Sequence, residues 1–333
     1  MKHDLRSACL GRWLAERFPG RRLSVTAASE DASFRRYFRV SLEGEPSLIV
    51  MDAPPDKEDC GPFLRVAALF AAAGAHVPQV HAADLGQGFL LLEDLGATTY
   101  LERLDAGSAG RMYSDAIDAL LRIQLASRPG ALPEYDHALL ERELRLFPQW
   151  YVASELGHGL SPADSETLET AFRAILANNL AQPKVYVHRD YHSRNLMVCE
   201  PCPGVLDFQD AVYGPITYDL ASLFRDAYIR WDEEQVLDWT IRYWEKARRA
   251  GLAVAPDFAD FYRDFEWMGL QRHIKVAGIF ARLCHRDGKQ RYLADIPLVL
   301  EYLLAACRRY RELVPLARLI ERLNDARARG AAP

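Results

Sequence analysis

The spacing of apolar residues changes along the chain and separates a strand-rich first part from a helical remainder. Residues 3–18 carry apolar side chains at helical intervals and end at Pro19 and Gly20, which predicts a helix. Residues 60–73 predict a second helix. Short apolar runs bounded by polar turns predict strands at 23–26, 37–40, 48–51 and 89–92.

From residue 101 onward the apolar pattern is helical. Stripes over 101–147 and 164–180 predict helices, and Pro148 interrupts the first of these stripes. The aromatic pair Trp150 and Tyr151 is interpreted as core packing, with the wall of a sugar pocket as the alternative. The last third of the chain predicts further helices at 217–230, 233–250, 257–285, 290–308 and 310–327.

Two short apolar runs in the middle of the chain end abruptly in acidic and amide residues. The run 185–187 leads to Asp190 and Asn195, and the run 205–208 contains Asp207. In phosphoryl transfer, one carboxylate orients the attacking hydroxyl and accepts its proton, while other oxygen ligands hold magnesium against the phosphates. Carboxylate and amide oxygens suit magnesium. The pattern therefore predicts Asp190 as the base and Asn195 with Asp207 as magnesium ligands.

These residues also carry a resemblance to known proteins. The segments HRDYHSRN at 188–195 and LDFQD at 206–210 resemble the catalytic loop and metal-binding segment of the protein-kinase-like superfamily. His192, two residues after Asp190, makes the pattern more similar to the aminoglycoside phosphotransferase family. Within that family, the chain resembles the bacterial anomeric kinases of N-acetylmuramate and N-acetylglucosamine, through residues 48–60, 187–197, 204–223 and 270–283.

The resemblance, which spans roughly residues 25–310, implies both a fold and a reaction. The fold is an α+β, two-lobed protein-kinase-like fold, with a small β-sheet N-lobe at 1–93 and a larger helical C-lobe at 94–333. The reaction is transfer of the ATP γ-phosphate, with Mg²⁺, to the anomeric hydroxyl of either sugar, which gives the 1-phosphate. The implied partners are the nucleotide and the sugar acceptor, in recycling of cell-wall sugars.

The resemblance also assigns residues to the nucleotide. Ser33, Arg35 and Arg36 fall where the superfamily keeps its phosphate-covering loop, although the segment has no glycine. An ordinary polar turn is an equally supported alternative. Glu93 and Leu95 fall at the linker between the lobes, where backbone groups bind the adenine edge.

A lysine that the superfamily carries on its third strand is missing. Met51 stands at that position, and the following helix at 60–73 lacks the glutamate that would pair with the lysine. The double absence is coherent, because one member alone would be an uncompensated buried charge. The positive charge at the phosphates then comes from magnesium, Lys57, or Arg35 and Arg36, which we favour.

Further residues near the motifs are assigned to catalysis, to the loop and to the acceptor. His192 stands where kinases keep a charge that faces the transferring phosphate, so it is assigned as a donor. His188 is predicted to brace the loop, and Asp219 to anchor the loop backbone. Arg194 and Asp210 are assigned to the acceptor or, for Asp210, to a second metal.

A basic helix face indicates the charge of the acceptor and adds Arg272 and Lys275 to the residues assigned to it. Residues 267–286 contain no acid, and Arg272, Lys275 and Arg282 share one face at helical spacing. Such a face favours a neutral or anionic acceptor, such as a sugar with a lactyl carboxylate, over a polycationic aminoglycoside. The alternative is a solvated basic face unrelated to substrate.

Composition and charge indicate which partners, which compartment and which cysteine chemistry to expect. A net charge of −5 gives no reason to expect nucleic acid or an anionic membrane as partner. The chain has no apolar signal segment and no run of eighteen apolar residues, so we expect a cytoplasmic protein. Six scattered cysteines do not form a disulfide framework. Cys199 and Cys202 form a CxxC, typical of half a zinc site or a redox pair, but we favour two ordinary turn cysteines.

Two alternatives to the sugar kinase remain open. One is a kinase of another small alcohol, such as an amino alcohol, a thiosugar or an aminoglycoside, on the same fold. The other is a nucleotide-binding protein without transferase activity, which the missing lysine and glutamate favour. The presence of Asp190, Asn195 and Asp207 together argues against the second alternative.

Overall fold

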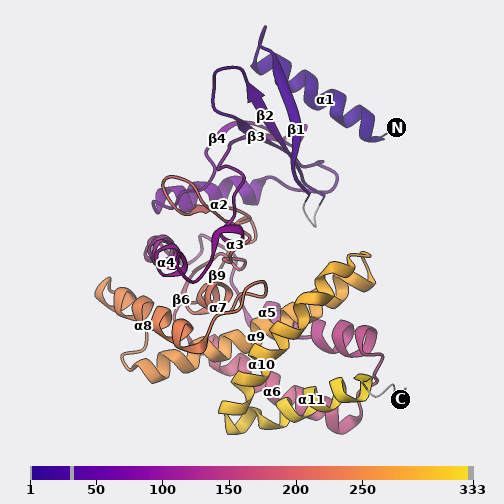
Figure 1. Cartoon of the computed structure of the whole chain (residues 1–333), viewed down its shortest axis with the longest axis vertical. Helices are drawn as coiled ribbons and strands as arrows, with labels where there is room; N and C mark the ends of the chain where they lie inside the picture. Colours follow the sequence, from indigo (N-terminus) through magenta and orange to yellow (C-terminus); the bar gives the residue numbers. More distant parts are fainter. Residues whose placement is uncertain (1, 31–33, 329–333) are drawn as a thin grey trace. The chain divides into compact units, whose positions relative to one another are not determined.

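The computed structural model describes residues 2–30 and 34–328, which divide into two compact units (Figure 1). Unit 1 comprises residues 1–98 and 197–210, and unit 2 comprises residues 99–196 and 211–333. Unit 1 contains a five-stranded sheet, and unit 2 is mostly helical, as the α+β prediction requires. The lobe boundary at residue 93 stays a prediction.

The sheet of unit 1 is antiparallel throughout, in the order β1-β2-β3-β5-β4. The predicted strands are confirmed and extended, and β4 is an addition that the sequence analysis missed. The strands are β1 (Leu23–Glu30), β2 (Arg36–Leu42), β3 (Leu48–Asp52), β4 (Val80–Asp84) and β5 (Phe89–Glu93).

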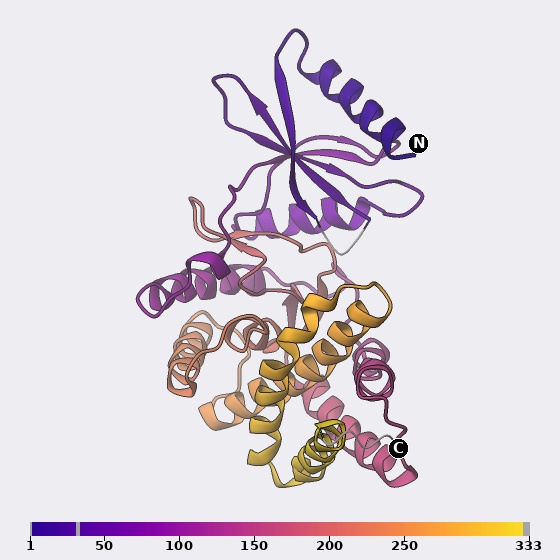
Figure 2. The same cartoon turned by 45° about the vertical axis from the view of Figure 1, so that its right-hand side comes forward.

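Helix α1 (Lys2–Arg17) lies alongside this sheet and closes a small core (Figure 2). Its Trp13 and Leu14 pack with apolar side chains of β2, β3 and β5. At the end of β3, the fully buried carboxylate of Asp52 accepts a hydrogen bond of 2.7 Å from Arg6 Nε and pairs with Arg36. These two guanidinium groups compensate a carboxylate that burial alone would make costly.

Helix α2 (Gly61–Ala72) packs against the 197–210 segment of unit 1. Phe208 packs its ring against Phe63 and Phe70 of this helix, with ring centroids 4.9 and 6.0 Å apart. The apolar side chain next to Asp207 therefore anchors the predicted metal-binding segment to α2.

Unit 2 contains the helices and short strands that carry the remaining motifs. Its helices are α3 (Tyr100–Arg103), α4 (Ala109–Leu125), α5 (His137–Leu144), α6 (Pro162–Ala181), α7 (Tyr218–Phe224), α8 (Glu233–Arg249), α9 (Phe258–His285), α10 (Ile296–Arg309) and α11 (Val314–Ala328). The strands β6 (Lys184–Val187) and β9 (Val212–Pro215) of this unit pair in an antiparallel ladder. The strand β7 (Leu196–Met197), at the end of this part of the chain, pairs with β8 (Gly204–Val205), which belongs to unit 1.

Three predicted helix bounds need correction. Residues 290–295 and 311–313 are 3₁₀ turns, and the α-helices begin after them, with Pro297 and Pro315 in their first turns. Proline fits there because the first helical N–H groups have no intrahelical acceptor. The helix predicted at 217–230 ends at Phe224.

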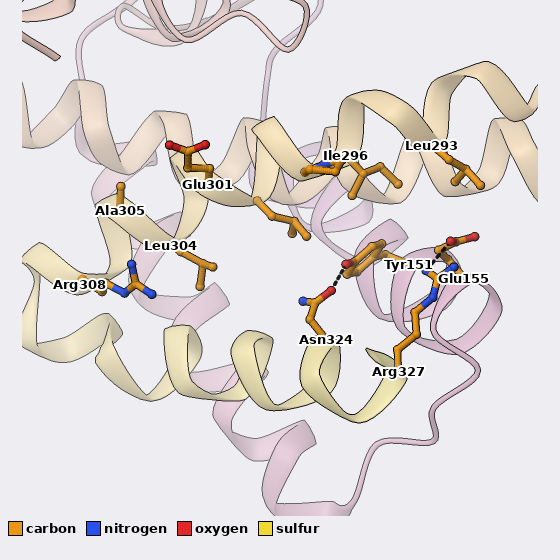
Figure 3. Close-up of a pocket in the computed structure, with 12 residues that line it drawn as sticks. Tyr151, Glu155, Leu293, Ile296, Glu301, Leu304, Ala305, Arg308, Asn324 and Arg327 are labelled. Atoms are coloured by element: carbon orange, nitrogen blue, oxygen red, sulfur yellow. Dashed lines mark hydrogen bonds and ion pairs between the residues drawn. The ribbon is translucent and has the colours of Figure 1, made fainter. Parts of the chain in front are cut away.

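The α-helical stripe ends at Leu144, ahead of Pro148, which confirms the predicted interruption, and Phe147–Glu155 then forms a π-helix, η1. Tyr151 is buried and stacks on Phe147, which confirms the core interpretation for this residue. Its hydroxyl donates to Asn324 Oδ1 at the edge of a pocket of about 570 Å³ between η1, α10 and α11 (Figure 3). The predicted site residues lie elsewhere in the chain.

In the described part of the chain, each helix is too short or too polar to cross a membrane.

Two glycines on α9 allow a matched test of how closely this helix packs against Leu146. A Cβ at Gly278 would lie 2.5 Å from the backbone carbon of Leu146, whereas a Cβ at Gly269 would meet its nearest atom at 3.8 Å. We expect Gly278→Ala to lower the free energy of unfolding by about 1–3 kcal/mol through overpacking. Gly269→Ala should be neutral or stabilise by up to about 1 kcal/mol through helix propensity. Equal urea midpoints for the two variants would contradict this close approach.

Candidate active site

The loop from His188 to Asn195 follows β6 and is fixed by buried side chains. Asp219, at the start of α7, accepts hydrogen bonds from the backbone N–H groups of His188 and Arg189, at 2.7 and 3.0 Å. The backbone N–H of Asp190 donates to His188 Nδ1 at 3.2 Å. These contacts confirm the predicted roles of Asp219 as an anchor and of His188 as a brace.

A second carboxylate, Asp226, holds the other end of the loop and was missed by the sequence analysis. Ser193 donates to Asp226 Oδ2 from its backbone N–H at 2.9 Å and from its hydroxyl at 2.5 Å. Asp226 is fully buried and also accepts from the backbone N–H of Tyr228. Its sequence signal is an acid two residues after the end of the apolar helix α7.

Two residues in the predicted catalytic segments adopt the left-handed backbone region that non-glycine residues rarely occupy. Arg189 has φ of 78° and Asp207 has φ of 61°. Such conformations cost about 1–3 kcal/mol each and concentrate at functional sites. One lies in each unit, in the segments that the motifs selected, although the motifs gave no sign of the strain.

The carboxylate of Asp190 is kept ionised by basic neighbours. Its side chain is 43% exposed, and Oδ1 lies 3.6 Å from Arg272 Nη1. Burial works to raise the pKa of Asp190, but Lys275 and Arg272 outweigh it and hold the pKa well below the ordinary range. Asp190 can therefore orient a hydroxyl group, and it can accept a proton only late in the reaction.

His192 is buried beside Asp190 and is uncharged at neutral pH. Burial lowers its pKa below the ordinary value, against the opposing effect of Asp226 and Asp190. Its backbone N–H donates to Asp190 O at 3.0 Å, and its ring meets the edge of Tyr228. Nδ1 has no hydrogen-bond partner among the described residues. His192 can supply a neutral N–H donor, and its contact with phosphate stays a prediction.

Glu143 on α5 is the centre of a buried charge cluster behind the loop. Its carboxylate accepts from Arg189 Nη2 at 2.5 Å, Lys275 Nζ at 3.0 Å, Gln271 Nε2 at 3.1 Å and the Tyr135 hydroxyl. Burial works to raise its pKa, but Lys275 and Arg189 outweigh burial and lower the pKa to about 2. Glu143 therefore stays charged and holds Arg189 in place.

The sequence contained a signal for Glu143 that the analysis did not use. Glu143 follows Leu139 by four residues and Leu140 by three, so it lies on the apolar stripe of its own helix. A charged residue on a core-facing stripe needs a buried partner. The partners lie on other elements, so the pattern indicates that a partner exists without identifying it.

The predicted basic face of α9 is buried, not solvated, at its first two members. Arg272 and Lys275 are 3% and 5% exposed. Arg272 Nη1 donates to Arg189 O at 2.9 Å, and Lys275 Nζ donates to the Tyr218 hydroxyl at 3.0 Å. The alternative of a solvated face is wrong for these two, and Arg282 is half-buried. Their contact with an acceptor stays a prediction.

The other residues assigned to the acceptor are exposed. The guanidinium of Arg194 lies 3.6 Å from the centroid of the Tyr228 ring, a cation–π contact next to the catalytic loop. Asp210 is exposed at the end of the 197–210 segment of unit 1. Both assignments stay predictions.

In unit 1, the two favoured arginines have different surroundings. Arg35 Nη2 lies 3.9 Å from Asp207 Oδ1, and Arg36 pairs with the buried Asp52. Arg35 is therefore the better placed of the two to add positive charge beside Asp207. Ser33 lies outside the described residues, and Met51 is buried in the sheet.

The predicted adenine linker is held by side-chain contacts within unit 1. Glu93 accepts from the backbone N–H of Gln79 at 3.1 Å, and its Oε1 lies 3.3 Å from His76 Nε2. Leu95 is buried. These contacts fix the position of the linker, and its binding of adenine stays a prediction.

The predicted metal ligands have the chemistry that magnesium requires. Gln209 donates to Asp207 Oδ1 at 2.7 Å, and Asn195 Nδ2 donates to Asp190 O at 3.0 Å. The other terminal atoms of the two predicted ligands, Asp207 Oδ2 and Asn195 Oδ1, are oxygens, the ligand type that Mg²⁺ prefers. Asp207 belongs to unit 1 and Asn195 to unit 2, and their common role stays a prediction.

Comparison with known proteins gives consistent matches. The model described as the phosphotransferase enzyme family matches residues 24–252. The N-acetylmuramate/N-acetylglucosamine kinase of Neisseria meningitidis serogroup B is 52% identical over 321 residues, 95% of this chain and 96% of that protein. The protein of the same name from Pseudomonas aeruginosa is 53% identical over 299 residues, 89% of this chain and 87% of that protein.

A solved structure supports the fold. A choline/ethanolamine kinase family protein from Mesorhizobium loti is similar with a TM-score of 0.63 and 14% sequence identity, over 95% of this chain and 99% of that chain. At this identity the likeness concerns the fold alone. It confirms the predicted kinase-like α+β fold.

The charge cluster around Glu143 predicts a stability that depends on acid. Because the folded-state pKa is near 2 and the ordinary value is 4.5, the stabilisation is present above pH 4.5 and is lost as pH falls toward 2. We expect Glu143→Gln to lower the free energy of unfolding by about 3 kcal/mol at pH 7 and to remove this acid dependence. Urea denaturation from pH 2 to 7 measures both effects.

Glu141→Gln on the same helix is the control for this prediction. Glu141 is partly exposed and pairs with Arg145. Exposed pairs contribute about 0–1 kcal/mol, so this variant should match the parent. Equal losses in the two variants would show that Glu143 stabilises the fold no more than a partly exposed carboxylate on the same helix.

Proposed function

The chain belongs to the phosphotransferase enzyme family, and we propose that it is an ATP-dependent kinase of N-acetylmuramate and N-acetylglucosamine. The observation that carries the proposal is identity above one half, over almost the whole chain, to kinases of that name. The product is the sugar 1-phosphate, formed at the anomeric hydroxyl. Such a reaction would serve recycling of cell-wall sugars in the cytoplasm.

Asp190 serves as the base in this reaction. A hemiacetal hydroxyl is more acidic than an ordinary alcohol, so a carboxylate of low basicity can orient it and take its proton late. The neighbouring Arg272 and Lys275 keep Asp190 ionised. Asp219 and His188 hold the loop backbone that presents it.

Asn195 and Asp207 are the residues that would hold magnesium, which supplies charge neutralisation at the phosphates when bound. Arg35, beside Asp207, adds the positive charge that the missing third-strand lysine would provide. Glu93 and Leu95 present the backbone groups that bind adenine. His192 offers a neutral donor to the transferring phosphate.

Basic groups near Asp190 suit the proposed acceptor. The charge of Lys275 is shared with Glu143, so Arg272 and the exposed Arg194 are the cations that remain for a lactyl carboxylate or a neutral sugar. The relatives do not favour the alternatives of a kinase for another alcohol or of a non-catalytic homologue.

An acceptor panel tests the proposal directly. With ATP and magnesium, ADP release should occur with N-acetylmuramate and N-acetylglucosamine but be weak or absent with glucose, choline, homoserine and kanamycin. Phosphorus NMR of the product should show an anomeric phosphate. Turnover only on other acceptors would leave the kinase chemistry in place and refute the sugar assignment, and no turnover on any acceptor would refute both.

The role of Asp190 has its own test. Asp190→Ala should reduce kcat by about 10²–10⁴-fold, because general-base catalysis is lost, while the dissociation constant for MgADP stays near that of the parent. Asp238→Ala, which removes an exposed carboxylate from α8, serves as the control and should leave both quantities unchanged. An Asp190→Ala variant as active as the parent would disprove the assignment of the base.

A further inference from the structure

Cys199 and Cys202 hold matching positions in the turn between β7 and β8. Cys199 is two residues beyond the last residue of β7, and Cys202 is two residues ahead of the first residue of β8. Because the two strands pair, the two cysteines stand on opposite arms of one six-residue turn. Neither is in a disulfide, and both are partly exposed. They are therefore accessible to small reagents and close enough along the chain to form a disulfide.

His76 connects this turn to the predicted adenine linker. Its Nδ1 lies 3.5 Å from Cys199 Sγ and 2.6 Å from the carbonyl oxygen of Pro201, and its Nε2 lies 3.3 Å from Glu93 Oε1. Its carbonyl oxygen accepts from the backbone N–H of Val205 at 2.7 Å. The imidazole is therefore held between the cysteine turn on one side and Glu93 on the other.

Leu95 gives a second connection to the same turn, through the surface of Gly204. A Cβ at Gly204 would lie 2.7 Å from Cys199 Sγ and 2.8 Å from Leu95 Cδ1. The sulfur and the leucine side chain therefore occupy the space that a side chain at 204 would fill. Glu93 and Leu95, the two residues assigned to adenine, are both packed against elements that Cys199 touches.

We propose that Cys199 and Cys202 are a reversible thiol–disulfide modification site whose oxidation weakens adenine-nucleotide binding at the Glu93–Leu95 segment. The thiol chemistry stands on the turn itself, and its effect on the nucleotide rests on the proposed kinase function. The co-reactant is a low-molecular-weight disulfide. The motif that the sequence analysis treated as two ordinary turn cysteines thereby acquires a role.

The chemistry proceeds in two exchanges. The thiolate of Cys202 attacks the external disulfide, forms a mixed disulfide and releases one external thiolate. Burial, with a smaller effect of Cys202, raises the pKa of Cys199 to about 11, so Cys199 is a thiol before reaction and transfers its proton to water. Its sulfur then attacks the Cys202 sulfur and releases the second external thiolate. Two protein thiols are oxidised, and one external disulfide is reduced to two thiols.

Closing this disulfide changes the contacts that support the linker. A sulfur–sulfur bond requires the two sulfur atoms to approach about 2 Å, which draws Cys199 Sγ toward Cys202. That sulfur contacts His76 Nδ1, and it lies beside Gly204 together with Leu95 Cδ1. Their displacement loosens the support of Glu93 and Leu95, and the affinity for nucleotide falls.

Treatment of the full chain with oxidised glutathione tests the proposal. Peptide mass spectrometry should find Cys199 joined to Cys202, with the loss of two hydrogen atoms, and calorimetry should find MgADP bound at least about fivefold more weakly. Dithiothreitol should restore both. Cys202→Ser should abolish the crosslink and the response, and Cys284→Ser, at a partly exposed cysteine in unit 2, should keep both.

A second variant tests the connection through His76. His76→Asn should still form the crosslink but lose most of the change in MgADP affinity. Absence of the Cys199–Cys202 crosslink, or a crosslink that leaves MgADP affinity unchanged, would overturn the proposal while the reduced protein still phosphorylates sugars. A reduced protein that forms the crosslink but binds no MgADP would instead show that the proposed kinase function has failed, and the nucleotide effect with it.

Discussion

Within each unit, the packing around the buried acidic side chains depends on the pairing of their charges. In unit 2, the buried carboxylate of Glu143 is surrounded by Arg189, Lys275, Gln271 and Tyr135, and this set fixes the arginine of the catalytic loop. In unit 1, the buried Asp52 plays the same part for two arginines. An unpaired charge in either place would cost several kcal/mol. The simultaneous absence of the third-strand lysine and its glutamate obeys the same rule.

Buried carboxylates also fix the backbone conformation of the loop that carries Asp190. Asp219 and Asp226 accept hydrogen bonds from backbone N–H groups on either side of Asp190, and His188 accepts the N–H of Asp190 itself. These contacts support the left-handed backbone of Arg189, which would be costly without them. The loop is therefore held rigid by carboxylates that take no part in the chemistry. The Asp190 carboxylate itself stays partly exposed.

The local surroundings set the charge state and the pairing of each ionisable group. Basic neighbours keep Asp190 charged, burial keeps His192 neutral, and Glu143 pairs with Lys275 and compensates much of its charge. Arg35 and Arg36 are adjacent in sequence but have different partners: Arg36 is the first residue of β2, and Arg35 precedes the strand. One lies near Asp207 and the other pairs with the buried Asp52. A sequence pattern alone cannot make that distinction.

Features that depend on local order could be predicted from the sequence alone. Strand and helix periodicity gave four of the five strands of the sheet and most helices, and the spacing of Asp190, Asn195 and Asp207 gave the class of chemistry. Only the tertiary structure decided which distant groups pair. Glu143 meets Arg189 across 46 positions and Gln271 across 128, and Asp226 meets Ser193 across 33. The π-helix at Phe147–Glu155 and the close approach at Gly278 likewise arise from packing between elements. Periodicity records which face of an element is buried, but the partner on the facing element is set by the folded chain, where residues far apart in sequence compete for the same space.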